Sequence, residues 1–174
     1  TGLTVSESSD DNTIFDNTIS TNTWYGIYIM SSNGNTLYHN NIMGNTYQNA
    51  FDDSSNIWDL SYPRGGNYWS DHTGPDSYRG RNQDITGADG IIDNGAGGLK
   101  PRVISGVGGN QDNYPWTTQN GWVGLIYGPV VNENTGLHYA SLQPAIDDVA
   151  TTDSHLIRVW AGVLNENINV SKSI

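Results

Sequence analysis

The 174-residue sequence predicts a mainly β protein that is built from short, stacked repeat units. Three observations lead to this prediction. A pattern of Asn, Thr and aliphatic residues recurs in the N-terminal third of the chain. Asn, Asp and Gly, which favour turns over helices, are abundant throughout. Only one short segment, near residue 145, spaces its apolar residues as a helix does.

The repeat becomes visible when residues 12–29, NTIFDNTISTNTWYGIYI, are aligned with residues 35–52, NTLYHNNIMGNTYQNAFD. A constant offset of 23 residues places like on like: Thr13 on Thr36, Ile14 on Leu37, Ile19 on Ile42. GLTV at the start of the chain is equivalent to GIYI about one period later, and NIWD (56–59) is the beginning of a third copy of the repeat. A unit of this length cannot bury its apolar residues alone, so the sequence predicts stacked coils with Asn-on-Asn ladders between them.

The coils and the segment after them carry a family resemblance. Residues 17–42, the stretch NAFDDSSNIWDLSYPRGGNYWSDHTG (49–74) and DNYPW (112–116) resemble NosD-like, pectin-lyase-like parallel β-helix repeat proteins, which are abundant at methanogen surfaces. The GGNYWSD element is the most specific part. The resemblance implies a right-handed parallel β-helix, a closing signature, and an archaeal, extracellular protein.

Three segments are expected. Residues 1–62 form the terminal coils, residues 63–121 form a Gly/Asn/Asp-rich closing module, and residues 122–174 form a capping helix with the first strands of a following β-helix. Ser141 is the predicted N-cap of that helix. Five aromatic residues are expected to form an apolar plug over the coils rather than a sugar-binding surface: Trp58, Tyr62, Tyr68, Trp69 and Tyr114.

The closing module contains a candidate calcium loop, DITGADGIID. Hard oxygen ligands that alternate with a turn-forming Gly are typical of Ca²⁺ loops. We predict side-chain ligands from Asp84, Asp89 and Asp93 and a carbonyl ligand from Ile91. The loop departs from the resembling family's pattern, because Gly87 stands where a side-chain ligand is expected. The alternative is an acidic, solvated turn.

Charge and motif content exclude several functions. The net charge of -11 and the pI near 4.3 argue against nucleic acids and anionic membranes as partners, and the longest apolar run is too short to span a membrane. The only adjacent carboxylates on the coils, Asp52 and Asp53, point to opposite faces if they lie in a strand, so we expect no enzyme. Copper is also not expected, because neither a Cys nor a second His accompanies Met30, Met43 and His39.

The function expected is structural. The last residues, LNENINVSKSI, alternate like a newly begun strand, and we predict that this strand completes the first coil of a neighbouring copy. The predicted head-to-tail interface joins two sets of apolar residues: Ile168, Val170 and Ile174 with Leu3, Val5 and Ile14. The result is a calcium-stabilised filament or array. Asn169 is a candidate glycosylation site. The alternatives are a segment of a long tandem-repeat surface protein, or a β-helix that binds or processes polysaccharide.

Overall fold

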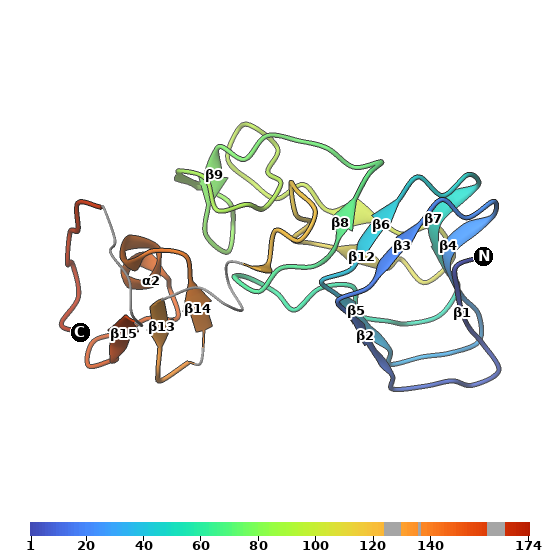
Figure 1. Ribbon diagram of the computed structural model, residues 1–174, viewed down its shortest axis with the longest axis horizontal. Helices are drawn as coiled ribbons and strands as arrows, with labels where there is room; N and C mark the ends of the chain where they lie inside the picture. The colour runs from blue at the N-terminus through green and yellow to red at the C-terminus, as the bar shows by residue number, and fades with distance from the viewer. Residues whose placement is uncertain (124–129, 136, 160–165) are drawn as a thin grey trace. The chain divides into compact units, whose positions relative to one another are not determined.

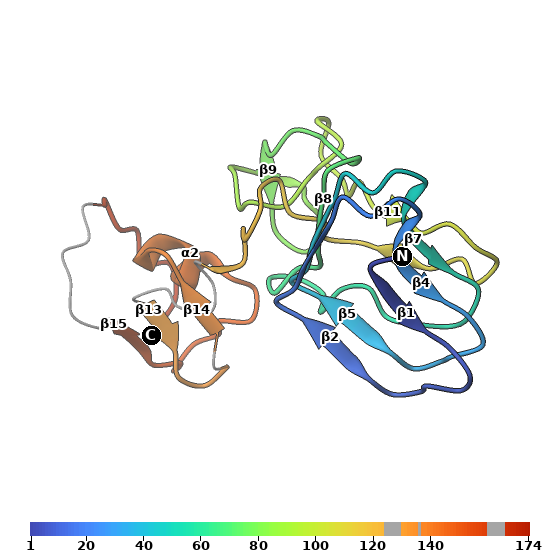
Figure 2. The ribbon, with the colours of Figure 1, turned by 45° about the vertical axis from the view of Figure 1, so that its right-hand side comes forward.

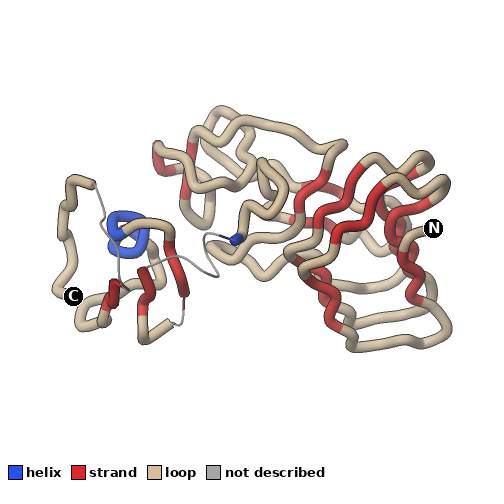
Figure 3. Tube along the Cα trace, viewed as in Figure 1, coloured by secondary structure: helices blue, strands red, loops and turns tan. Residues whose placement is uncertain are grey.

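The computed structural model describes residues 1–123, 130–135, 137–159 and 166–174. The chain divides into two compact units, Thr1–Gly121 and Trp122–Ile174, and each is described by itself. Within the described ranges the protein is mainly β, as predicted, and α2 (Leu142–Asp147) is its longest helix. Figure 3 shows that the strands are short and that loops connect them. None of the described helices is long and apolar enough to cross a membrane.

In unit 1, strands from successive repeats lie side by side in three parallel sheets (Figures 1 and 2). The first sheet contains β1 (Leu3–Val5), β4 (Tyr25–Ile29) and β7 (Gln48–Asp52). The second contains β2 (Thr13–Phe15) and β5 (Thr36–Tyr38). The third contains β3 (Thr18–Ser20), β6 (Asn41–Met43) and β8 (Tyr68–Trp69). These sheets are short, and the described residues do not form a closed solenoid.

The strand register confirms the repeat that the sequence predicts. Ile14 pairs with Leu37 and Ile19 pairs with Ile42, so the 23-residue offset of the alignment is the offset of the coils. Aliphatic side chains from each coil therefore stack inside unit 1. The core contains nine buried residues: Val5, Ile27, Ile29, Leu37, Ile42, Ala50, Trp58, Trp69 and Ile104. At about 25 cal/mol per Å² of buried apolar surface, such stacking offsets the ordering of strands too short to be stable alone.

Residues 63–121 close one end of the coils with irregular loops and short antiparallel pairs. β9 (Tyr78–Arg79) pairs with β10 (Ile85–Thr86), and β11 (Arg102–Val103) pairs with β12 (Gln111–Asp112). Of the predicted plug residues, Trp58, Trp69 and Tyr114 are buried. The rings of Trp58 and Trp69 lie 5.7 Å apart and belong to the core.

Unit 2 differs from the expected start of a β-helix. β13 (Val130–Asn132) pairs on one side with β14 (Leu137–Tyr139) and on the other with β15 (Ile157–Val159), and both pairings are antiparallel. Helix α2 forms where the sequence predicts it, and Ser141 occupies the N-cap without a side-chain hydrogen bond. The Glu166 carboxylate accepts hydrogen bonds from the backbone N–H groups of Leu142 and Gln143 instead.

The predicted final strand is a second difference. The structure assigns no strand to residues 166–174, which we call the tail. The tail's backbone is engaged by side chains: Asn169 N donates to Gln143 Oε1 at 2.7 Å, and Ser173 N donates to Asp153 Oδ1 at 3.0 Å. The rest of the predicted strand, residues 164 and 165, lies outside the described residues.

Candidate functional site: the open end of the coils

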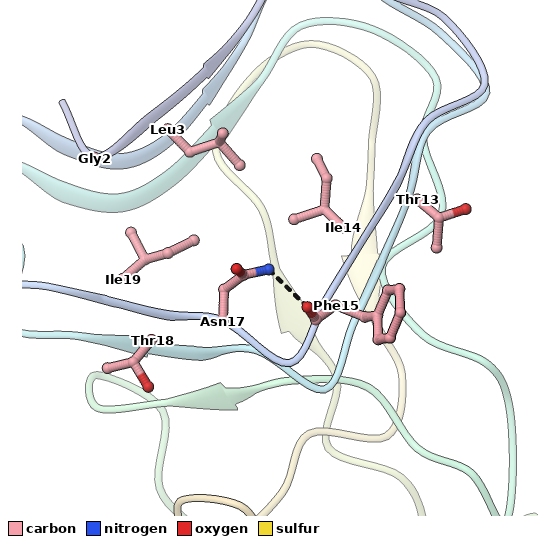
Figure 4. Close-up of a pocket in the computed structure, with 8 residues that line it drawn as sticks. All are labelled: Gly2, Leu3, Thr13, Ile14, Phe15, Asn17, Thr18 and Ile19. Atoms are coloured by element: carbon pink, nitrogen blue, oxygen red, sulfur yellow. Dashed lines mark hydrogen bonds between the residues drawn. The ribbon is translucent and has the colours of Figure 1, made fainter.

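The first coil leaves one end of unit 1 uncovered by the rest of that unit, and we call this surface the open end. Figure 4 shows a hollow there, lined by side chains of β1, β2, β3 and their connections. The lining consists of eight residues: Gly2, Leu3, Thr13, Ile14, Phe15, Asn17, Thr18 and Ile19. Leu3, Ile14 and Ile19 are only partly buried, although they pack against the core. In the next coil, the counterparts Leu37 and Ile42 are fully buried.

Three Asn ladders run from the open end through the coils, as the sequence predicts. In the central ladder, the Asn17 side-chain amide donates to Asn40 Oδ1 at 3.1 Å, and the Asn40 amide donates to Asn67 Oδ1 at 3.0 Å. The backbone N–H of each donor residue binds the same acceptor oxygen. Each rung therefore uses the amide nitrogen and backbone N–H of one coil and the carbonyl oxygen of the next, so the ladder has a direction.

The two flanking ladders have the same direction. Asn12 donates to Asn35 Oδ1, and Asn35 donates to Asn56 Oδ1, with side-chain distances of 3.0 and 3.1 Å. On the other side, Asn22 donates to Asn45 Oδ1 at 2.9 Å. All rungs thus point away from the open end, because every donor sits one coil closer to it than its acceptor.

Two of the ladders end on acceptors inside residues 63–121, the closing segment, and the third ends on Asn49 Oδ1 in β7. Asp112 Oδ2 accepts from the Asn67 backbone N–H at 2.7 Å and from the Trp69 indole at 2.8 Å. Asn110 Oδ1 accepts from Asn56 N at 3.2 Å. The Asp112 side chain only accepts hydrogen bonds from these partners, so it terminates its ladder. Sequence reasoning did not identify Asp112 or Asn110 as caps, because each follows its ladder partner by more than 40 residues without a repeat.

At the open end the ladders begin on unused acceptors. The Oδ1 atoms of Asn12, Asn17 and Asn22 receive no hydrogen bond from any residue that the structure describes, although the equivalent atoms one coil further in each receive two. This end therefore presents three carbonyl acceptors around the partly covered Leu3, Ile14 and Ile19. The chemistry of the surface matches the donor side of one more coil.

The predicted interface residues are only partly found in this arrangement. Leu3 and Ile14 line the open end, whereas Val5 is buried in the core and pairs with Ile29. In the tail, Ile168, Val170 and Ile174 are exposed by 45%, 57% and 41%. Unit 1 and unit 2 therefore each carry exposed or partly exposed apolar residues of the predicted interface. The Asn169 backbone is held by Gln143, which donates to the Asn169 carbonyl at 3.1 Å.

The predicted calcium ligands do not come together. Asp89 accepts hydrogen bonds from the Gln83 side chain at 2.8 Å and the Ile91 N–H at 3.1 Å, and burial raises its pKa to about 6. Asp93 is fully buried and accepts N–H groups of Tyr78 at 2.7 Å and Gly95 at 2.6 Å. Asp84 is exposed, and Ile91 is buried beside Trp116. Among the described residues, no group of three His, Cys, Asp or Glu side chains is placed to hold a metal ion.

These carboxylates hold backbone turns where the sequence predicted ion ligands. A neighbouring residue, Asp76, does the same: it accepts the N–H groups of Asp89 and Gly90 at 2.9 and 2.8 Å. Aspartates accept such bonds readily in irregular loops. The alternation of Asp and Gly that suggested an ion site is therefore explained by turn chemistry.

The remaining chemical candidates are occupied by contacts within the fold. Asp52 is buried and accepts the Trp58 indole N–H at 2.9 Å, while the adjacent Asp53 accepts the Ser31 N–H at 3.0 Å. His39 is buried with Nε2 at 2.7 Å from the Arg64 carbonyl, and burial lowers its pKa.

One comparison with known proteins gives a match. Residues 1–74 match the family model described as "Periplasmic copper-binding protein (NosD)". This confirms the NosD-like resemblance over that segment. The comparisons with curated proteins and with solved structures found no match.

The residues of this chain do not fit the copper centre that the family's description implies. The chain has no Cys. The Met30 sulfur accepts a hydrogen bond from the Tyr28 hydroxyl at 3.5 Å. Nε2 of the buried His39 is hydrogen-bonded to the Arg64 backbone carbonyl. Copper sites in proteins are built from converging imidazole and sulfur ligands. Met30 follows β4, His39 follows β5 and Met43 lies in β6. Met30 and His39 already have other partners within the fold.

Proposed function

We propose that this chain, NosD-like over residues 1–74, is a structural protein of the cell exterior or periplasm that assembles through its coils. In this proposal unit 1 is the terminal part of a right-handed parallel β-helix, and the open end accepts one further coil. The single observation that carries the proposal is the set of unused Asn12, Asn17 and Asn22 carbonyl oxygens around an incompletely covered apolar end. Strand edges of this kind pair with other chains unless they are blocked.

The proposed occupant is the tail of a second copy. The tail carries Ile168, Val170 and Ile174 exposed, and it belongs to no sheet in the described structure. Its main-chain N–H groups and Asn side chains are donors of the kind that the open end lacks. Because the donor and acceptor surfaces differ, the contact is head-to-tail and propagates into a filament or array when it does not close into a ring.

The proposal assigns no catalytic role. Asp52 and Asp53, the adjacent carboxylates of the coils, do not converge: Asp52 contacts the core indole, and Asp53 contacts a backbone turn. Paired carboxylates that act on a glycosidic bond must face a common substrate. The alternative is an archaeal, tandem-repeat surface protein. In that protein the same contact between coils would join segments of one covalent chain.

Sedimentation velocity and electron microscopy of the full chain over a range of concentrations test assembly. We expect concentration-dependent elongated particles. Ile14→Asp at the open end should abolish these particles, because it buries a charge in the interface. Val170→Pro in the tail should also abolish them, because it removes a main-chain hydrogen-bond donor. Val107→Asp is the matched control, since Val107 is exposed by 86% in the closing segment. Circular dichroism checks that each variant is folded.

Two outcomes contradict the proposal: a wild-type protein that stays monomeric at the highest concentration, or folded Ile14→Asp and Val170→Pro variants that still elongate. A synthetic peptide of residues 164–174 provides a direct measurement. It should bind wild-type protein and fail to bind the Ile14→Asp variant.

A further inference from the structure

Five aromatic side chains form a continuous cluster on the outer side of β4 and β7, and we call it the aromatic face. Its members are Trp24, Tyr25, Tyr28, Tyr47 and Phe51. Tyr25 is the hub, with ring centroids 4.8 Å from Tyr28, 5.1 Å from Tyr47 and 5.8 Å from Phe51. Trp24 extends the cluster through Tyr47 at 5.7 Å.

The aromatic face repeats with the coils. Tyr28 pairs in register with Phe51, and their rings stack at 5.2 Å with an interplanar angle of 17°. Trp24 and Tyr47 are related by the same 23-residue offset. The face therefore presents rings from two successive coils. A surface with this repeat suits a chain-like ligand that itself repeats.

The face is both exposed and rigid. Trp24 and Tyr47 are exposed by 60% and 59%, which leaves large apolar ring surfaces in water. In β4, Ile27 and Ile29 flank Tyr28 and are fully buried, so the core fixes the strand backbone that follows Trp24 and carries Tyr25 and Tyr28. Trp and Tyr side chains provide rigid, amphipathic contact area at a low cost in conformational entropy.

Charge restricts the class of ligand. Residues 1–62 contain neither Lys nor Arg, and the chain carries a net charge of -11. Sulfated or uronic-acid polymers would meet repulsion without a cation to bind them. The polar neighbours of the rings are neutral: Thr4 is the register partner of Tyr28, and Gln48 is that of Tyr25.

We propose that the aromatic face binds a neutral glycan chain. A pyranose ring has an apolar face of C–H groups and a rim of hydroxyls. The C–H groups stack on the electron-rich faces of Trp24 and Tyr47, while the hydroxyls reach Tyr hydroxyls and the neutral side chains beside them. The face uses other residues than the open end, so glycan binding and assembly succeed or fail independently.

The test is titration of full-length protein with three neutral oligosaccharides, cellohexaose, xylohexaose and chitohexaose, followed by calorimetry and Trp fluorescence. At least one should bind. Trp24→Ala and Tyr47→Ala should each weaken that binding at least tenfold, and Tyr47→Phe should retain most of it. Ile57→Ala is the control, because Ile57 is exposed by 54% and pairs with Thr36 of β5, away from both the aromatic face and the open end.

Three results overturn the proposal: no signal at millimolar concentrations of all three oligosaccharides, equal losses in Ile57→Ala and Trp24→Ala, or preferential binding of oligogalacturonate. A fourth does so as well. If Trp24→Ala and Tyr47→Ala change sedimentation of the protein but not glycan titration, the face contacts protein. Near-UV circular dichroism confirms that the variants keep their tertiary structure.

Discussion

The indole N–H of Trp69 donates a hydrogen bond to Asp112 Oδ2 at 2.8 Å, across 43 residues of sequence. Both residues are fully buried. The same oxygen accepts the Asn67 N–H, and the second carboxylate oxygen accepts the Tyr114 N–H at 3.1 Å. One carboxylate thus joins the last rung of the central ladder, the core indole and the closing segment. Gly66 lies against it, since an added Cβ there would approach Asp112 Oδ1 to 1.9 Å.

Asp112→Ala should destabilise the protein strongly. The substitution leaves several buried donors without an acceptor, and each such group costs about 1–3 kcal/mol. We therefore expect a loss of at least roughly 3 kcal/mol in the free energy of unfolding, measured by denaturant titration with Trp fluorescence. Asp84→Ala is the control, because Asp84 is exposed, and it should change stability by less than about 0.5 kcal/mol. Equal effects would show that Asp112 does not organise the closing segment.

Stability should fall as pH rises from 6.5 to 8. Burial raises the pKa of Asp112 to about 7 from an ordinary value of 3.8, so the folded state binds a proton in this window that the unfolded state has already lost. The free energy of unfolding then decreases with pH, by on the order of 1 kcal/mol. Burial lowers the pKa of His39 and His72, and their opposite contribution is confined to pH values near and below 6.5.

Denaturant titrations at pH 6.5, 7, 7.5 and 8 measure this dependence. Asp112→Asn removes the titrating group and should flatten the profile, whatever its effect on the absolute stability. Stability that rises over this range, or an unchanged slope in Asp112→Asn, would refute the assignment.

The ladders predict a gradient of sensitivity from the open end inward. Asn40→Ala should cost about 2–4 kcal/mol, because the buried Asn40 amide serves the Ile14 and Tyr38 carbonyls as well as its rung. Asn17→Ala, the same change one coil outward, should cost about 1 kcal/mol, since Asn17 is exposed and its own carbonyl oxygen is unused. Thermal and chemical unfolding of both variants would reveal the difference, and similar losses would contradict the ladder's direction.

Calcium should have little effect on the stability of the monomer. Asp89 and Asp93 already hold backbone and Gln83 amides, so Ca²⁺ would have to break these bonds to enter. We expect no shift of the unfolding temperature between chelator and millimolar Ca²⁺, and no binding heat in calorimetry. A clear stabilisation that Asp89→Asn and Asp93→Asn remove, and that the exposed Asp71→Asn leaves intact, would restore the predicted calcium site.

The sequence by itself determined the coils of unit 1. The 23-residue offset predicts which strands pair, because neighbouring coils must place Ile14 on Leu37 and Ile19 on Ile42 to bury both, and a slip of one residue would turn them outward. The Asn ladders follow from the same offset. Helix α2 was also predictable from the helical spacing of Leu142, Ala145, Ile146 and Val149. Ala145 and Ile146 are its buried residues.

Tertiary structure alone decided which residues end the Asn ladders and what the acidic loop does. Asp112 reaches Asn67 and Trp69 through a non-repeating chain path, so no local pattern indicates that contact. Asp89 and Asp93 resemble ion ligands in sequence, because ion ligands and turn acceptors are the same chemical group. Only the positions of the surrounding N–H donors distinguish the two. In unit 2, alternation of residues predicted strands but not their direction: β13 pairs antiparallel with both neighbours, since strand direction is set by the path of the connections and not by side-chain periodicity.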